Sequence, residues 1–216
     1  MTSNDAAPET PPDDGATGLS THGAVYGRVS GLIVNRLWKE TPSARALRAQ
    51  LRGALSREAG SVPELWDLTL DGRPGYLGDE PTRGEKAVHG ALTLWALHQG
   101  SNTRPMHDSS ERPRSFASAI RVVAEGQRGD KRAEETPIYR RFSAAVQVPT
   151  FEGLLVHLRS LVSQLEAAEI PCDYGGLAAD LFTWQDPRRR ASVMRNWGRQ
   201  FARPAETIHA DSASDE

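Results

Sequence analysis

The sequence has little cysteine, few aromatic residues and no long apolar run. Its 216 residues include one cysteine, Cys172, so no internal disulfide can form and we expect a reducing, cytoplasmic setting. The most apolar N-terminal stretch, residues 25–38, is interrupted by Arg28, Asn35 and Arg36, whereas a membrane-spanning helix needs about 20 apolar residues. The first twenty residues also lack the apolar segment of a signal peptide. These absences argue against a membrane-embedded or disulfide-rich protein.

Basic residues are scarce at both ends and concentrated between them. The formal net charge is −2, but residues 1–20 and 204–216 contain acidic residues and no lysine or arginine. Residues 21–203 therefore hold all 26 basic residues and a net charge of about +6. A mildly basic body favours a polyanionic partner, although an ordinary solvated surface would look the same. Both acidic ends offer almost nothing to bury, so we expect them to be disordered.

The body of the chain reads as helices separated by short breaks, with no convincing strand or hairpin pattern. Apolar periodicity and capping residues predict an all-α fold of about eight or nine helices. The segment from about Thr82 to Gln99 is apolar nearly all round, which indicates a helix buried on most sides. Ser115, Thr136 and Thr150 are predicted N-caps of later helices. The remaining predicted helices cover about 25–40, 42–55, a short segment from 61, 174–185 and 188–202, with a turn at Asp71-Gly72.

A long irregular stretch, residues 100–114, separates two groups of predicted helices. Loops beyond about 12 residues are uncommon and are often functional or disordered. We therefore expect two small helical bundles, residues 21–103 and 104–203, joined by this basic loop. Residues 126–135 form a second charged loop.

The sequence matches known catalytic and metal-binding motifs poorly. The segment from Gly78 to Lys86 has five residues between its glycines and lacks the Ser or Thr of a phosphate-binding P-loop. His89 and His98 lie nine residues apart on one predicted helix, about 180° out of phase, so they do not converge on a metal. The dipeptide His107-Asp108 leaves a metal-dependent phosphohydrolase as an alternative. Otherwise the sequence predicts no catalytic residue, no metal and no cofactor.

In the C-terminal helices, arginines lie on the faces opposite the apolar residues. In the last helix, Val193 and Trp197 mark the core side, and Arg188, Arg195 and Arg199 fall opposite. Guanidinium groups on rigid helices suit the bidentate binding of phosphate oxygens. The tryptophans lie mostly on apolar faces, so few aromatics are expected to be exposed for base stacking. We therefore expect contacts mainly with a nucleic-acid backbone, with weak dependence on base sequence.

The C-terminal two thirds of the sequence contain a series of short motifs: Ala96-Leu97-His98-Gln99, Pro105-Met106-His107, Phe116-Ala-Ser-Ala119, Arg140-Arg141-Phe142, His157-Leu-Arg159-Ser-Leu161, Asp173-Tyr174, Leu177-Ala178-Ala179-Asp180-Leu181, Trp184, Arg190-x-x-Val193 and Trp197-Gly198-Arg199-Gln-Phe201. In order and spacing, these motifs resemble the small subunit (CasB family) of the type I-E CRISPR Cascade complex. The resemblance covers roughly residues 85–201. The acidic ends are not part of the family pattern.

This resemblance implies a helical, non-catalytic subunit of a CRISPR RNA-guided surveillance complex. It implies contact with the guide RNA, with the target and displaced DNA strands, with the large and backbone subunits, and with a second copy of the chain. Guide pairing reads the sequence in such complexes, so protein contacts need only hold the backbone and the displaced strand. A protein–protein scaffold whose arginines pair with partner acids is the alternative.

The predicted nucleic-acid contacts combine matched motifs, helix faces and charged loops. They are Arg104, Arg112, Arg114, Arg121, Lys131, Arg132, Arg140, Arg141, Arg159, Arg188, Arg195 and Arg199.

Overall fold

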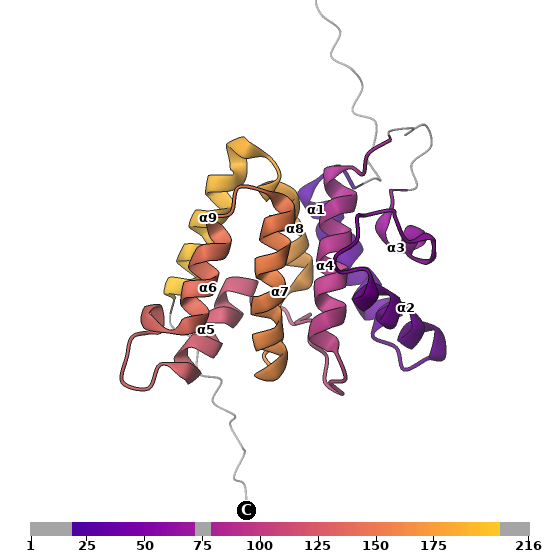
Figure 1. The fold of residues 1–216 in the computed structure, drawn as a ribbon. Helices are drawn as coiled ribbons and strands as arrows, with labels where there is room; N and C mark the ends of the chain where they lie inside the picture. Colours follow the sequence, from indigo (N-terminus) through magenta and orange to yellow (C-terminus); the bar gives the residue numbers. More distant parts are fainter. Residues whose placement is uncertain (1–18, 72–78, 204–216) are drawn as a thin grey trace, which may run out of the picture.

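The computed structural model describes residues 19–71 and 79–203, and within them the chain is all-helical. The N-terminal elements are α1 (His22–Leu32), the π-helical turn η1 (Ile33–Leu37), α2 (Pro42–Gly53), the 3-10 turn η2 (Pro63–Leu65), α3 (Trp66–Thr69) and α4 (Arg83–Gln99). The C-terminal elements are α5 (Phe116–Gln127), the 3-10 turn η3 (Ala133–Glu135), α6 (Pro137–Val146), α7 (Phe151–Ala167), α8 (Tyr174–Trp184) and α9 (Pro187–Ala202). The predicted all-α class and helix number are confirmed for these residues (Figure 1).

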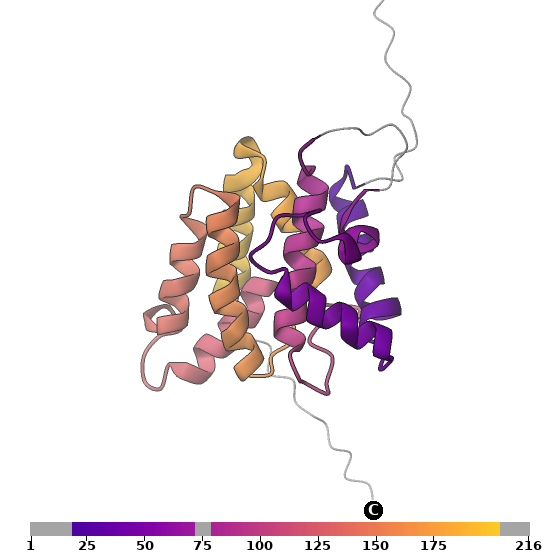
Figure 2. The ribbon, with the colours of Figure 1, turned by 45° about the vertical axis from the view of Figure 1, so that its right-hand side comes forward.

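Helix α4 is the centre of the N-terminal half and part of the contact with the C-terminal half. It packs against α1, α2, α3, α7 and α8, and 14 of its 17 residues are buried. Thr82 caps it in a capping box with Glu85, whose Oε2 accepts from the Thr82 N–H at 2.7 Å. Figures 1 and 2 show α4 standing between α7 and the N-terminal helices. The near-continuous apolar surface predicted for this segment is explained by these neighbours.

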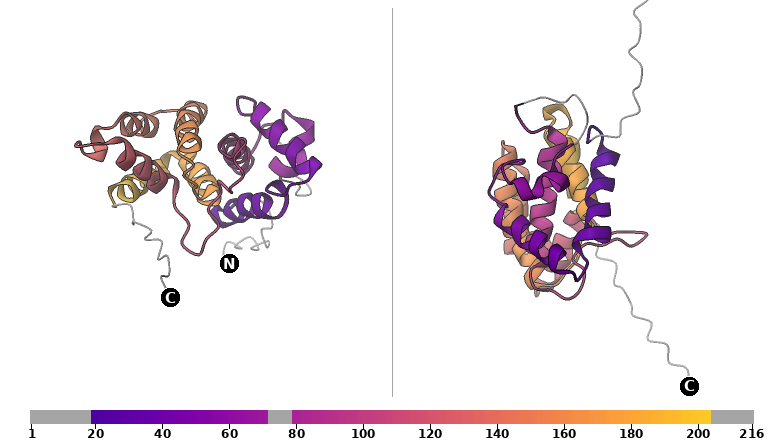
Figure 3. Two further views of the ribbon diagram at one scale, coloured as in Figure 1. Left: turned by 90° about the horizontal axis from the view of Figure 1, so that it is seen from below. Right: turned by 90° about the vertical axis from the view of Figure 1, so that its right-hand side faces the viewer.

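The two halves share one hydrophobic core. The cluster of buried apolar residues runs from Leu19 to Phe201 without a break between the halves. Helix α8 packs against α1 and α4 across the expected junction (Figure 3). A Cβ added at Gly175 of α8 would lie 2.2 Å from Ser30 Oγ of α1. Glycine therefore permits this close helix crossing. The division at residues 103 and 104 stays a prediction.

Local polar groups set the helix ends much as the sequence indicates. Ser115, Thr136 and Thr150 each accept a hydrogen bond from the backbone N–H three residues on, at 3.3, 3.3 and 3.2 Å. The predicted first helix differs, because regular α-helix ends at Leu32 and a π turn follows. The buried Arg48 guanidinium donates to the Leu37 carbonyl at 2.8 Å and so satisfies the end of this turn. Gly72 of the predicted turn at Asp71-Gly72 and most of the two acidic ends lie outside the described residues.

Candidate nucleic-acid interface

The long loop of residues 100–114 is held in place by hydrogen bonds. The Gln99 side chain donates to the carbonyls of Asn102 and Arg104 at 2.7 and 2.9 Å and accepts from the Met106 N–H at 3.0 Å. Further along, the Asp108 carboxylate accepts from the Arg114 N–H at 2.7 Å. These bonds give the loop a fixed path over the end of α4.

The loop also pairs with the segment that precedes α8. Residues His107 and Cys172 form an isolated parallel bridge, and the Tyr174 N–H donates to His107 Nδ1 at 3.2 Å. Burial lowers the pKa of His107, with a partly opposing effect of Asp173. Burial raises the pKa of Asp108, but hydrogen bonds from Arg114 and Ser110 outweigh it and leave that pKa lowered. His107 and Asp108 thus have structural partners.

The loop arginines differ in their freedom. Arg104 is exposed at 71% and lies 3.9 Å from Glu169, which makes it a loosely paired surface cation. Arg112 is exposed and forms no ion pair with the residues that the structure describes. Arg114 is half-buried, and its guanidinium donates to the Pro171 carbonyl at 3.5 Å. Of the three, Arg112 is the most available to an external phosphate.

Arg121 lies against its own protein. Its side chain is only 15% exposed and pairs with Glu125 at 2.5 Å and Glu134 at 3.1 Å. Its guanidinium also lies 5.3 Å from the centre of the Phe201 ring. Helical periodicity alone predicts that Arg121 points away from the core face of its helix, but this is wrong, because the η3 turn and α9 lie against its side chain. Lys131 and Arg132, on the neighbouring loop, are exposed and form no ion pair with described residues.

Helices α6 and α7 carry three exposed arginines. Arg140 and Arg141 follow the Thr136–Pro137 start of α6, whose Ile138 and Phe142 are buried. The Arg141 guanidinium reaches Gln164 of α7 at 3.5 Å. Arg159 is an exposed residue of α7. None of the three forms an ion pair within the described chain, so their charges face solvent.

Helix α9 presents a row of exposed arginines, which we call the α9 row: Arg188, Arg195 and Arg199. The buried side of α9 is fixed by Trp197, whose Nε1–H donates to Asp180 Oδ2 of α8 at 2.6 Å. Arg190 is held differently, with its guanidinium 3.9 Å from the centre of the Trp184 ring and 2.9 Å from the Pro149 carbonyl. These contacts lock the helix while the α9 row forms no ion pair with any described residue.

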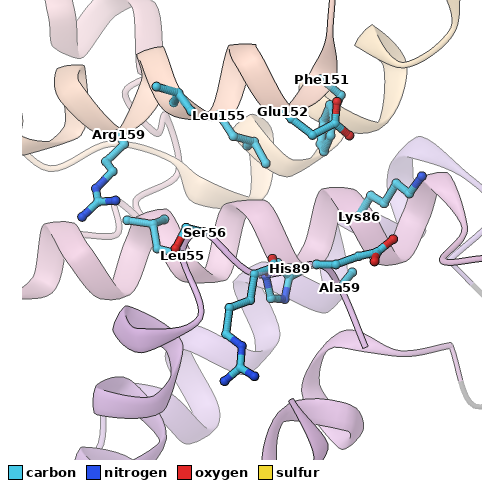
Figure 4. Close-up of a pocket in the computed structure, with 12 residues that line it drawn as sticks. Leu55, Ser56, Ala59, Lys86, His89, Phe151, Glu152, Leu155 and Arg159 are labelled. Carbon is cyan, nitrogen blue, oxygen red and sulfur yellow. The ribbon is translucent and has the colours of Figure 1, made fainter. Parts of the chain in front are cut away.

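Sequence reasoning missed two cations that line the same groove as Arg159. Arg57, in the loop after α2, and Lys86, on α4, line a groove of about 440 Å³ with Arg159. The groove is also lined by Leu55, Ser56, Glu58, Ala59, His89, Phe151, Glu152, Leu155 and Val156. Figure 4 shows side chains of α7 facing those of α4 and the loop after α2 across it. Because the α7 wall lies about 60 to 100 residues along the chain from the other lining segments, no local pattern could have joined them.

Comparison with known proteins identifies the chain. The family model of CRISPR-associated protein Cse2 matches residues 47–201. The chain belongs to the Cse2 family. The crystal structure of CasB from Thermobifida fusca is similar, with a TM-score of 0.64 and 29% identity over 83% of this chain and 96% of that chain. The crystal structure of M. ruber CasB has a TM-score of 0.55 and 21% identity over 84% of this chain and 92% of that chain, which supports the fold.

Family membership makes this Cse2 protein a subunit of a CRISPR complex. The resemblance inferred from the motifs is confirmed, and the matched region begins earlier than those motifs, at residue 47. Comparison with curated proteins gave no match.

Other features of the described chain bear on alternative functions. No group of three or more His, Cys, Asp or Glu residues lies close enough to hold a metal ion among residues 19–71 and 79–203. In the same ranges, no helix is long and apolar enough to cross a bilayer. Cys172 is fully buried, and burial raises the pKa of its thiol, so it is a poor nucleophile.

Proposed function

We propose that this Cse2 protein is a non-catalytic nucleic-acid-binding subunit of a CRISPR RNA-guided surveillance complex. Its arginines support the guide RNA–target DNA hybrid and the displaced strand by contact with phosphates. The observation that carries the proposal is that ten of its twelve predicted contact residues form no ion pair within the described chain, whereas Arg104 and Arg121 are paired. An unpaired guanidinium keeps its donors available for a phosphate.

The α9 row adds geometry to this argument. Its three arginines lie seven and four residues apart, so they project from one face over roughly 16 Å of helix. The helix is anchored from behind through Trp197 and Arg190. Rigid anchoring lowers the entropy lost when the side chains bind a polyanion. This face therefore suits an extended strand.

The proposed partners are the guide RNA, the target and displaced DNA strands, the large and backbone subunits, and a second copy of the chain. We expect no turnover by the subunit itself, and neither cofactor nor metal. Nuclease activity of the purified protein with added Mg²⁺ or Mn²⁺, abolished by His107→Ala, would contradict this part of the proposal.

A salt titration of single-stranded DNA binding tests the central claim. Fluorescence anisotropy with labelled dT15 should show log Kd rising linearly with log salt, with a slope of about 0.7 per contacted phosphate. Arg188→Ala/Arg195→Ala/Arg199→Ala and Arg140→Ala/Arg159→Ala should each weaken binding and lower the slope.

The control is Arg36→Ala/Arg45→Ala, which removes the same charge as the Arg140/Arg159 pair. Both control arginines are paired within the chain, with Asp67 at 2.6 Å and Glu40 at 3.0 Å, so this variant should keep the slope. Equal slopes in all variants would refute the assignment of these arginines. Absence of binding by the unaltered protein would favour the scaffold alternative.

A further inference from the structure

The groove between α7 and the loop after α2 has features that phosphate contact alone does not require. One wall is a stripe of α7 at helical spacing, consisting of Glu152, Leu155, Val156 and Arg159. Val156 is 69% exposed, the most exposed large apolar side chain in the described residues. Leu55 lies across the groove near Arg159 (Figure 4). An apolar interior bounded by charged groups is typical of a small-ligand site.

The floor of the groove is fixed by a neutral histidine. His89 of α4 is 4% exposed, and its Nε2 lies 3.2 Å from the Ala54 carbonyl and 3.0 Å from the Arg57 carbonyl. Since carbonyls only accept, Nε2 carries the proton and Nδ1 is an acceptor, which has no hydrogen-bond partner. Burial lowers the pKa of His89 and keeps this tautomer neutral. These bonds also hold the Arg57 backbone at the groove.

Charge is separated along the groove. Figure 4 places Arg159 at one end and Phe151, Glu152 and Lys86 at the other. Glu152 and Arg159 are seven residues apart on one helix, or about 10 Å. None of these charged groups forms an ion pair with a described residue. One end therefore offers a donor for a phosphate, and the other offers a donor and an acceptor for the polar edge of a base.

We propose that this groove takes up one unstacked nucleotide of a bound single strand, with its phosphate at Arg159 and its base between Leu155 and Leu55. This inference rests on the proposed nucleic-acid binding and adds a base-dependent contact to it. The base packs against Leu155 and Val156 and presents its polar edge to Glu152 and Lys86. Because every base has an apolar face and a polar edge, the contact selects for the presence of a base more than for its identity.

The volume and position of the groove support this occupant. About 440 Å³ falls within the range of small-ligand sites, roughly 300–1,000 Å³. Arg159 belongs both to the predicted phosphate contacts and to the groove wall. A strand bound at Arg159 would therefore lie at the opening of the groove. A peptide segment with apolar and charged side chains is the competing occupant, and the experiment below separates the two.

The test compares dT15 with a 15-residue abasic strand, which carries the same phosphates and no bases. The unaltered protein should bind dT15 at least fivefold more tightly, the lower limit for one buried or stacked base. Val156→Ser and Leu155→Ala should reduce this ratio toward one and leave the salt slope unchanged. Val34→Ser is the matched control, because Val34 is an exposed valine (46%) outside the groove.

A crosslink locates the base directly. A strand containing 5-iodouracil, irradiated in complex with the full chain, should crosslink to the peptide that contains Phe151. Val156 is exposed, so its variant is expected to fold, and circular dichroism checks both variants.

The outcomes separate the two claims. If the protein binds both strands equally with a normal salt slope, the base site is refuted and phosphate binding stands. If it binds neither strand, both claims are refuted. If the groove variants impair assembly with the other subunits of the complex but keep the dT15 preference, the groove holds a peptide and the nucleotide proposal is wrong.

Discussion

The partly buried carboxyl of Asp180 gives a pH-dependent stability that can be worked out from the structure. Its principal hydrogen bond comes from the Trp197 indole at 2.6 Å. Burial raises the pKa of Asp180 to about 6 from an ordinary value of 3.8, although this hydrogen bond acts in the opposite direction. In the window between these values, the folded protein binds a proton that the unfolded chain does not. The stabilising contribution is therefore full below pH 3.8 and lost as pH rises through about 6.

The magnitude follows from the two pKa values. A pKa difference of one corresponds to 1.36 kcal/mol, so ionised Asp180 costs at most about 3 kcal/mol above pH 7. Solvent reaches part of the side chain, so we expect about 1–2 kcal/mol. Asp180→Asn removes the charge and keeps an oxygen that accepts from Trp197. It should raise the melting temperature at pH 8 by about 2–8 °C and have little effect near pH 4.

The measurement is the difference in melting temperature between the variant and the unaltered protein from pH 4 to 8. Using the difference matters because His98 titrates in the same window with the opposite sign. Burial lowers the pKa of His98 to about 4, so its contribution is present above pH 6.5 and lost as pH falls toward 4. A difference that does not change with pH, or a less stable variant at pH 8, would refute the reasoning.

Three further predictions concern residues with structural roles. Arg121→Ala removes two ion pairs and a ring contact, so it should lower the unfolding free energy by about 1–2 kcal/mol. The salt slope of dT15 binding should stay unchanged, and a lower slope would show that Arg121 contacts the nucleic acid. Gly175→Ala should lower the unfolding free energy measured in urea by about 1–3 kcal/mol, because the added Cβ would lie 2.2 Å from Ser30 Oγ across the α1–α8 crossing. Gly198→Ala, whose Cβ meets nothing within 4 Å, is its control and should be neutral or stabilising by up to about 1 kcal/mol. Tyr174→Phe removes the hydroxyl that lies 2.8 Å from the buried His98 and should cost about 1–3 kcal/mol, and an unchanged denaturation midpoint would show that this bond contributes nothing.

Most helix positions were predictable because their causes are local. Ser115, Thr136 and Thr150 cap helices through bonds to residues three positions on, and such pairs are visible in a sequence. The apolar periodicity of α7 and α9 likewise comes from the 3.6-residue repeat of the helix. The π turn after Leu32 was not predictable from local sequence. The Arg48 guanidinium of the next helix donates to the Leu37 and Lys39 carbonyls at the end of this turn.

The candidate site was only partly predictable. Periodicity correctly placed Arg188, Arg195 and Arg199 on the exposed side of α9, since the side opposite Trp197 has to face outward. The same reasoning failed for Arg121, because η3 and α9 cover the face that its own helix leaves open.

The sequence by itself determined the helical class, the helix caps and the family, because each depends on neighbouring residues or on ordered local motifs. Only the tertiary structure decided which cations are free and which are paired, because ion pairs such as Arg121 with Glu134 join residues on different elements. It also brought Arg57 and Lys86 to the same groove as Arg159. That convergence depends on the packing of α4 against both α2 and α7, which no single stretch of sequence encodes.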